Sequence, residues 1–378
     1  GEDGIAGICD DKQLLCFSVA MWNKKDPIIK ERLFGLGGNE GNHGEDVKEL
    51  YYYLDSTPTH SYMKMLYKYP QNEFPYGKLV EENQKRNKLQ KEYELTDTGV
   101  FDEDKYFDVF IEYAKASEED ILIQITIHNR GTEDASLHLL PQVWFRNTWS
   151  WGYDNYRPHL KVDESGNVLI DHEALGHFTL HLENKAPLLF CDNETNNSRL
   201  YGAGNNSTFV KDGINDFLIN RNSKAVHTNG DATKVAVNYD LVVKGKASTT
   251  IRLRLSPGNN HPFESFDAIL KERIKEADEF YAALQSDITS DEVRMVQRQA
   301  FAGMLWSKQF YYYDIPQWLR GDPAQPPPDP ARLKGRNHEW IHLNNADIIS
   351  MPDKWEYPWY AAWDLAFHCI PISLVDPQ

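Results

Sequence analysis

A stretch close to the end of the sequence combines carboxylates with many aromatic side chains. Asp364 lies between Trp363 and Leu365, and Asp353 and Glu356 precede it. The aromatic residues nearby are Trp355, Tyr357, Trp359, Tyr360 and Trp363. Tyr and Trp rings offer flat apolar faces with a polar edge, which suit sugar rings that have apolar C–H faces and hydroxyl rims. A carboxyl group among such rings suits acid catalysis on a carbohydrate.

Two opposing effects act on the proton of Asp364. Apolar neighbours disfavour the charged form of a carboxyl group, and a general acid must keep its proton near neutrality. The N-terminus of a helix, expected near Trp359, favours the anion instead. The sequence therefore leaves two alternatives for Asp364: a catalytic acid, or a helix-capping or ion-paired residue beside core aromatics.

The residues near Asp364 are candidates either for binding a sugar or for packing in the core. Helix geometry points Trp359 and Trp363 the same way, so these two and Tyr357 are the favoured sugar platform, with core packing as the alternative. His368 lies four residues after Asp364 on the same helical face, where it would contact substrate, contact the acid or serve a structural role.

Trp355 and Glu356 are also expected to bind substrate. Asp353 and Glu356 have two further interpretations, as solvated loop charges or as calcium ligands, although no EF-hand spacing is present. We therefore expect no metal and no cofactor.

The elements that must position these residues change type along the chain. Residues 1–257 alternate apolar and polar side chains in short runs separated by Gly, Asn and Asp turns, which predicts a β-sandwich or barrel. The expected strands are 14–21, 50–54, 62–68, 106–115, 121–127, 138–146, 177–183, 187–191, 234–244 and 251–255.

The remainder of the chain predicts helices and a long loop. Apolar residues in 262–285 form one helical stripe, and Thr289 with Glu292 predicts the start of a second, buried helix that runs to about residue 310. Residues 314–358 predict an irregular loop, and a last helix is expected from about Trp359. We expect an incomplete catalytic domain that continues beyond Gln378.

The charged residues of the sequence limit the classes of molecule that this protein is expected to bind. The sequence has 40 Lys and Arg against 57 Asp and Glu, a net charge of −17. This surplus of negative charge argues against binding to nucleic acid or to an anionic membrane surface, and it is compatible with neutral substrates. No secretion signal or long apolar run is present, so a cytoplasmic, reducing location is expected for the four cysteines, Cys9, Cys16, Cys191 and Cys369.

Three other features of the sequence suggest a function, and each also has a simpler structural interpretation. Sequons at Asn193, Asn196, Asn205 and Asn206 fit N-glycosylation, but an ordinary polar loop is preferred. The Gly-rich stretch 35–44 lacks the motifs of a nucleotide site. A group of three tryptophans and one arginine is expected to take part in core and hinge packing, with the rim of a pocket as the alternative: Trp144, Arg146, Trp149 and Trp151.

Several strings together resemble glycoside hydrolase family 63, in particular its prokaryotic glucosidase-like members, which include mannosylglycerate hydrolases and relatives of the processing α-glucosidases. The strings are YPW (357–359), WDLAFH (363–368), GNHGEDVKE (41–49), LDSTPTHSY (54–62), WFRNTWSW (144–151) and GMLWSKQFYYY (303–313). The resemblance spans nearly the whole chain.

The resemblance implies a fold and a reaction. It implies an N-terminal β-sandwich of the supersandwich kind, followed by the first helices of an (α/α)6 barrel, and hydrolysis of α-glycosidic bonds with inversion. The acid of the family maps onto Asp364, and the base would lie beyond Gln378, so this chain alone is expected to be inactive. The eukaryotic branch has Glu where Leu365 stands, which argues against a glucosylated glycan as substrate.

These observations predict three segments. A β-sandwich that lacks its first strands is expected over 1–257, a linker helix and first barrel helix over 258–313, and a substrate-side loop with the acid-bearing helix over 314–378. The favoured function is that of an inverting α-glycoside hydrolase, α-glucosidase-like, acting on oligosaccharides or glycosylated small molecules. The alternative is a non-catalytic carbohydrate-binding or structural module.

Overall fold

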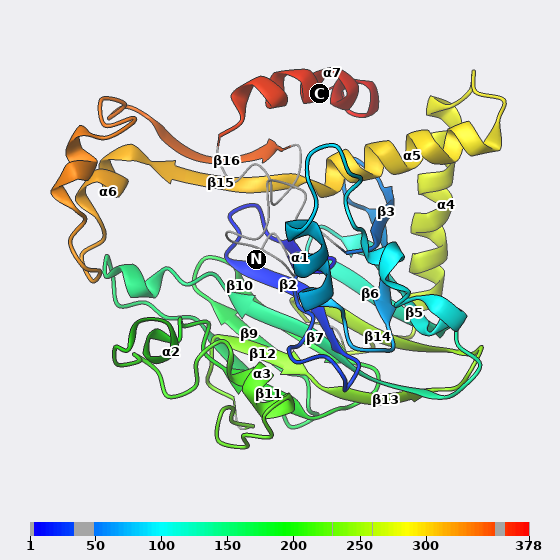
Figure 1. Cartoon of the computed structure of the whole chain (residues 1–378), viewed down its shortest axis with the longest axis horizontal. Helices are drawn as coiled ribbons and strands as arrows, with labels where there is room; N and C mark the ends of the chain where they lie inside the picture. The colour runs from blue at the N-terminus through cyan, green and yellow to red at the C-terminus, as the bar shows by residue number, and fades with distance from the viewer. Residues whose placement is uncertain (1–3, 34–48, 229, 259, 352–359, 378) are drawn as a thin grey trace.

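The computed structural model describes residues 4–33, 49–228, 230–258, 260–351 and 360–377. Two large antiparallel sheets contribute to one shared core, and most of the helices lie around them (Figure 1). The structure therefore confirms the predicted sandwich.

The larger sheet has eight strands in the order β3-β4-β5-β6-β14-β10-β9-β8. Each of its neighbouring strands pairs antiparallel. In that order the strands are β3 Tyr51–Ser56, β4 Tyr62–Pro70, β5 Tyr106–Ser117, β6 Asp120–Asn129, β14 Ser248–Ser256, β10 Gly176–Leu182, β9 Val168–His172 and β8 His159–Val162.

The smaller sheet has six strands, in the order β1-β2-β7-β12-β11 with β13 also paired to β7. The strands are β1 Ile8–Cys9, β2 Leu15–Trp22, β7 Ala135–Phe145, β12 Lys234–Val237, β11 Leu188–Cys191 and β13 Tyr239–Val243. The single run predicted over 234–244 is thus two strands, which meet at Asn238.

Alternation along the strands explains the core. In β2 the side chains of Phe17, Val19 and Met21 enter the space between the sheets, whereas Ala20 joins a second apolar cluster on the outer face. The outer cluster includes residues of α3 (Gly213–Leu218). Because period-two alternation places successive side chains on opposite faces, one strand serves both clusters.

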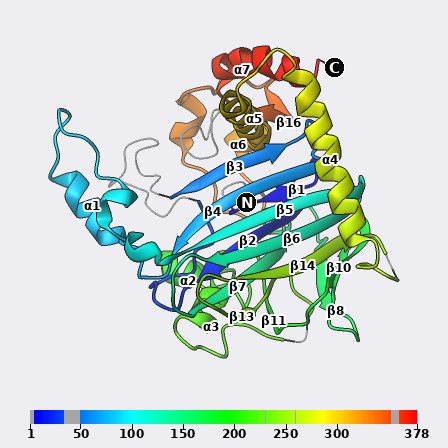
Figure 2. The ribbon, with the colours of Figure 1, turned by 90° about the vertical axis from the view of Figure 1, so that its right-hand side faces the viewer.

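Two long helices follow the sandwich, as predicted: α4 Phe266–Leu284 and α5 Asp291–Trp306. Figure 2 shows α4 running along the larger sheet, where it packs against β4, β5 and β6. The cap of α5 is Ser290, whose side chain accepts from Val293 N–H, rather than the predicted Thr289. The buried end of α5 confirms the expected burial, because Phe301, Leu305 and Trp306 are almost inaccessible to solvent.

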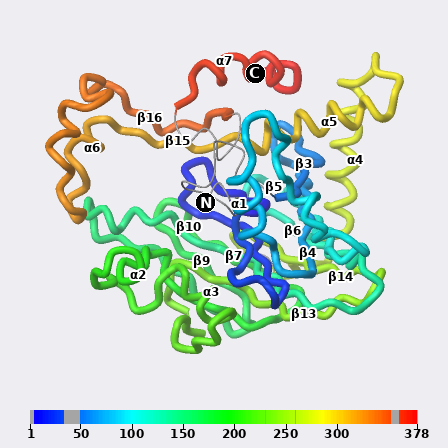
Figure 3. Tube along the Cα trace, in the orientation of Figure 1, coloured from blue at the N-terminus to red at the C-terminus, as the bar shows by residue number. Residues whose placement is uncertain are grey.

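The prediction of an irregular loop after the second helix was wrong. The helix ends at Trp306, and the chain enters a strand, β15 (Lys308–Asp314), which pairs in register with β16 (Asn344–Ser350). Between them lie α6 (Ile315–Arg320), labelled in Figure 3, and a 3-10 turn at Pro330–Lys334. β16 contains few typical strand formers, so its pairing with β15 was not visible in the local sequence.

The last helix, α7, spans Ala362–Val375, a little later than its predicted start near Trp359. Figures 1 and 2 show α5, α7 and the β15–β16 hairpin together on one side of the sandwich. Smaller elements lie elsewhere: α1 Tyr76–Gln84, α2 Asn197–Tyr201 and 3-10 turns at Leu95–Thr98, Asp102–Asp104 and Trp149–Trp151.

Candidate functional site

Of the residues predicted to handle substrate, the structure describes Asp364, Trp363 and His368. All three lie on α7. The other predicted residues, Trp355, Glu356, Tyr357 and Trp359, and the possible calcium ligand Asp353, lie outside the described residues.

The inner face of α7 rests on the β15–β16 hairpin and on the long helices. Leu365 packs against the apolar cluster formed by Ile349, Met351 and Ala361. At the far end of α7, Val375 packs with Tyr281 of α4 and Phe301 of α5. These contacts fix the rotation of α7, and thereby the direction of every side chain on it.

Asp364 stands in the first turn of α7 and is half-buried. Four residues later, His368 Nδ1 lies 3.0 Å from Ser350 Oγ of β16 in a hydrogen bond. Positions four apart share a helical face, so Asp364 and His368 lie on neighbouring parts of the surface that α7 presents to the hairpin. The described contact of His368 is thus with Ser350, and its predicted contact with substrate stays a prediction.

The outer face of α7 carries large apolar side chains in solvent. Trp363 is 77% exposed and Phe367 58%, with their ring centroids 5.9 Å apart. Ile370 and Leu374 continue this stripe and are also exposed. Trp363 thus points away from the hairpin.

A loop of the sandwich contacts the hairpin through Arg146. Its guanidinium lies over the rings of Trp151, Phe310 and Tyr312, at 5.3, 5.2 and 5.0 Å from their centroids. The rings of Trp151 and Tyr312 are stacked at 5.9 Å. Cation–π contacts of this kind join the loop after β7 to β15, so Arg146 and Trp151 pack between the two parts of the molecule, as the preferred interpretation expected.

Trp144 and Trp149 complete the predicted group of tryptophans around Arg146. Both lie nearby, but among the described contacts neither takes part in the stack around Arg146. Trp149 Nε1 donates to Glu194, and its ring packs against the main core. Trp144 pairs across the sheet with Cys16 and Lys234.

Sequence reasoning missed a chain of hydrogen bonds beside Arg146. Tyr312 Oη donates to Gln317 Oε1 at 2.6 Å, and Gln317 Nε2 donates to Asp322 Oδ1 at 2.7 Å. Tyr153 Oη of the sandwich loop reaches the same Asp322 oxygen at 3.1 Å. Aromatic faces and polar groups thus share one surface. The only local signal was the run of tyrosines at 311–313.

Away from α7, the buried carboxylate of Asp55 makes contacts that hold two elements together. Asp55 of β3 forms an ion pair with Arg298 of α5, which also pairs with Asp278 at 2.7 Å. Burial raises the pKa of Asp55, and the hydrogen bond and charge of Arg298 oppose that rise. Trp306 Nε1 donates to the Asp55 carbonyl oxygen at 3.0 Å. This group fastens α5 to the sandwich.

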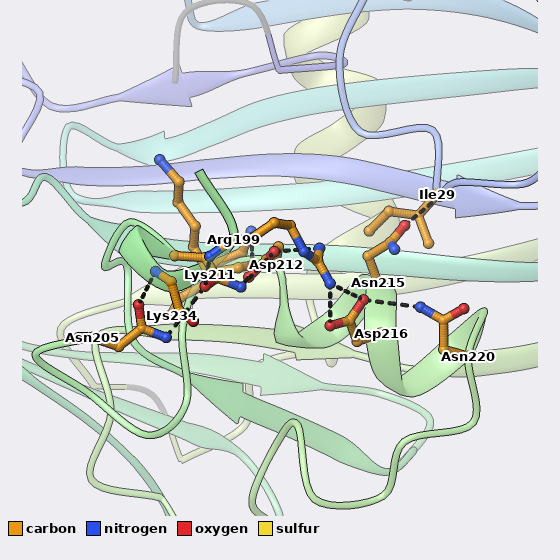
Figure 4. Close-up of polar contacts among 11 residues, drawn as sticks. Ile29, Arg199, Asn205, Lys211, Asp212, Asn215, Asp216, Asn220 and Lys234 are labelled. Atoms are coloured by element: carbon orange, nitrogen blue, oxygen red, sulfur yellow. Dashed lines mark hydrogen bonds and ion pairs between the residues drawn. The ribbon is translucent and has the colours of Figure 1, made fainter. Parts of the chain in front are cut away.

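The Asn-rich stretch is a hydrogen-bonded cap on the smaller sheet (Figure 4). Asn196 caps α2 by accepting from Arg199 N–H, and Arg199 pairs with Asp212 and Asp216. Asn215 Oδ1 accepts from Ile29 N–H at 3.0 Å, which ties α3 to the chain after β2. Of the sequon residues, Asn193, Asn196 and Asn205 use their side chains in hydrogen bonds within the chain.

No group of three or more His, Cys, Asp or Glu in the described ranges of the chain could hold a metal ion. None of the helices among the described residues combines the length and apolar character needed to span a bilayer.

The sequence is similar to that of a curated yeast protein. An uncharacterized protein of Saccharomyces cerevisiae is 42% identical over 429 aligned residues, which cover 100% of this chain and 39% of that protein. The chain therefore spans well under half the length of this relative. No protein-family model matches the chain, so the resemblance to glycoside hydrolase family 63 stays a prediction.

Solved structures match only loosely. A protein assigned as a kojibiose phosphorylase from human microbiome covers 83% of this chain and 37% of its own, with 11% identity and a TM-score of 0.28. A polysaccharide lyase covers 45% of this chain and 22% of its own, with 14% identity and a TM-score of 0.23. Both TM-scores are too low to define a shared fold.

Proposed function

We propose that this chain is the sandwich and acid-bearing part of an inverting α-glycoside hydrolase, with Asp364 as the general acid. The observation that carries the proposal is the position of Asp364, a half-buried carboxylate in the first turn of a helix seated on the hairpin beside His368 and Ser350. The motif around Asp364 supplies the reaction class.

The reaction places one demand on this carboxyl group. Asp364 donates its proton to the oxygen of the leaving group while a second carboxylate activates a water on the opposite face of the sugar. Inversion requires the two carboxyl groups to be roughly 6.5–9.5 Å apart so that the water fits between them. In this proposal the second carboxylate comes from the part of the longer protein outside these 378 residues. No cofactor takes part.

The test is Asp364→Asn in the longer protein, assayed on α-linked disaccharides. We expect kcat to fall by roughly 10²–10⁴-fold while saccharide binding persists, because general acid catalysis contributes about that factor. An α-glycosyl fluoride needs little protonation of its leaving group, so its hydrolysis should fall much less. NMR of the product should show the β-anomer first.

The matched control is Asp291→Asn, a change in an exposed carboxylate in the first turn of the neighbouring helix α5. It should leave turnover unchanged. Near-normal disaccharide turnover by the Asp364 variant would remove Asp364 from the mechanism, and an equal loss on the fluoride would assign it a role other than the acid.

A second candidate is a non-catalytic carbohydrate-binding module. The exposed ring of Trp363 and the surface of Trp151, Tyr153 and Tyr312 favour it, because such rings bind sugars without any base. This function predicts saccharide binding by the 378-residue chain that Asp364→Asn does not alter and that Tyr312→Ala weakens. Isothermal titration with α-linked oligosaccharides separates the two candidates.

A further inference from the structure

Two cysteines oppose each other at the start of the sandwich. β1 and β2 pair antiparallel, with Ile8 opposite Phe17 and Cys9 opposite Cys16. Ile8 and Phe17 contribute to the core between the sheets, so the next pair along must point to the outer face. Both sulfur-bearing side chains therefore lie on the same side of the same pair of strands.

The hydrogen-bond pattern places the cysteines at the closer of the two possible spacings. Asp10 N–H donates to the Leu15 carbonyl oxygen, and Leu15 N–H donates to Asp10 Oδ1 rather than to its carbonyl, so residues 10 and 15 stand at a hydrogen-bonding position where the turn begins. Such positions alternate along an antiparallel ladder, which makes Cys9 and Cys16 a non-hydrogen-bonded pair with Cα atoms about 4.5 Å apart. That spacing falls inside the range of about 4.4–6.8 Å found for disulfides.

The two thiols differ in access. Cys9 is exposed on the edge strand, whereas Cys16 is buried, 4% exposed, beside the strand that carries Trp144. An oxidant in solution can therefore reach Cys9 first. The Cys16 thiol donates to the Gln13 carbonyl oxygen at 3.8 Å, and it is the thiol opposite Cys9 in the strand pair. This is the arrangement of an attacking thiol and a resolving thiol.

We propose that Cys9 and Cys16 form a reversible dithiol–disulfide site that reacts with small-molecule disulfides such as oxidised glutathione. The Cys9 thiolate attacks one sulfur of the small disulfide and releases one glutathione thiolate. Cys16, after losing its proton to solvent, then attacks the Cys9 sulfur and releases the second. The protein dithiol is oxidised to a disulfide, and one glutathione disulfide is reduced to two glutathione thiols.

The site lies next to the contact between the sandwich and the hairpin. The loop that the disulfide would close includes Leu14, whose carbonyl oxygen accepts from Arg146 N–H at 2.9 Å. Arg146 is the residue that stacks on Trp151, Phe310 and Tyr312. The inference stands apart from the proposed hydrolase activity, because it concerns only the thiols.

The experiment equilibrates the 378-residue chain in glutathione buffers of stepped redox ratio, followed by acid quenching, alkylation after unfolding and peptide mass mapping. We expect the alkylation of Cys9 and Cys16 to be lost together, with a peptide pair lighter by the two thiol hydrogens. Dithiothreitol should restore both. Cys369, exposed on α7, serves as an internal reference that takes up glutathione as a mixed disulfide.

Variants make the result decisive. Cys16→Ser should leave Cys9 carrying glutathione, and Cys9→Ser should protect Cys16 from oxidation, with far-ultraviolet circular dichroism confirming that both variants fold. The double variant Cys191→Ser with Cys369→Ser should keep the Cys9–Cys16 disulfide. The proposal is overturned if the parent chain accumulates glutathione on Cys9 while Cys16 stays fully alkylatable at every ratio.

Discussion

The Asp55–Arg298 pair shows how one buried charge depends on its partner. The carboxylate of Asp55 is nearly inaccessible, and one of its oxygens, Oδ1, has no hydrogen-bond partner among the residues that the structure describes. Removing one member of a buried pair costs about 3–5 kcal/mol, because the other charge remains without compensation. Arg298 also lies over the ring of Tyr281, at 4.7 Å from its centroid.

We predict that Arg298→Gln lowers the free energy of unfolding by about 3 kcal/mol near neutral pH, measured by urea denaturation. Burial raises the pKa of Asp55 in the folded state, and loss of the cation raises it further. The folded variant therefore binds this proton more tightly than the unfolded chain does, so stability falls as pH rises above the ordinary carboxyl range. The deficit should be smaller in mild acid than at neutral pH.

Asp278→Asn is the control for the Arg298→Gln variant. Asp278 pairs with the same arginine but is largely exposed, so its loss should change stability by less than about 1 kcal/mol. A deficit of Arg298→Gln that is constant with pH would show that lost packing, rather than the uncompensated carboxylate, accounts for the effect.

At the scale of elements, one cation takes part in the contact between the sandwich loop and β15, beside the stacked rings of Trp151 and Tyr312. Arg146 lies against three rings, two of which belong to the hairpin. The hairpin is otherwise a two-stranded sheet, which is marginally stable on its own.

We predict that Arg146→Ala destabilises the β15–β16 hairpin by about 1 kcal/mol. The amide protons of 308–314 and 344–350 should exchange roughly five times faster, while those of β5 and β6 should not change. Arg146→Lys should restore part of the protection, because it keeps the charge but loses the planar group that stacks on rings. If amide exchange accelerated equally in the hairpin and in β5 and β6, the effect of Arg146 would not be confined to the hairpin.

The outer face of α7 is a second element-scale feature. Trp363, Phe367, Ile370 and Leu374 form an exposed apolar stripe, and exposed patches of this kind promote association. We predict that the 378-residue chain self-associates at micromolar concentration and that Phe367→Asp shifts it toward monomer in sedimentation velocity.

Val242→Asp is the matched control for this face, since Val242 is as exposed but lies on β13. It should leave the association unchanged. A monomeric parent chain, or an equal response to both substitutions, would refute the link between α7 and association.

For the molecule as a whole, the core of the sandwich is completed by a helix that follows it in sequence. Ala302 and Trp306 of α5 belong to the main core cluster, and the ring of Trp306 stacks on Tyr53 at 5.2 Å. The boundary expected at residue 257 would leave these core residues outside the sandwich.

We therefore predict that a fragment ending at residue 257 is less stable than one ending after Trp306, by thermal unfolding and by binding of a hydrophobic dye. In the whole chain, Trp306→Ala should cost about 3–5 kcal/mol through the cavity it leaves. Val296→Ala on the exposed face of the same helix should cost under about 0.5 kcal/mol. Equal melting of the two fragments would show that the sandwich is complete without α5.

The sequence by itself determined the features that depend on local periodicity. Alternation in runs such as 121–127 identified the sandwich strands, because one face of each strand must be apolar. The helical stripes identified α4 and α5 for the same reason. The position of Asp364 in the first turn of a helix also followed from its neighbours.

Only the tertiary structure decided which distant segments meet. The pairing of β15 with β16, the stack on Arg146 and the insertion of Trp306 into the sandwich core join residues far apart in the chain. A local pattern cannot encode such contacts, because they depend on the combined packing of several elements. The opposition of Cys9 and Cys16 needed only a short turn, but its register was fixed by the core residues beside it.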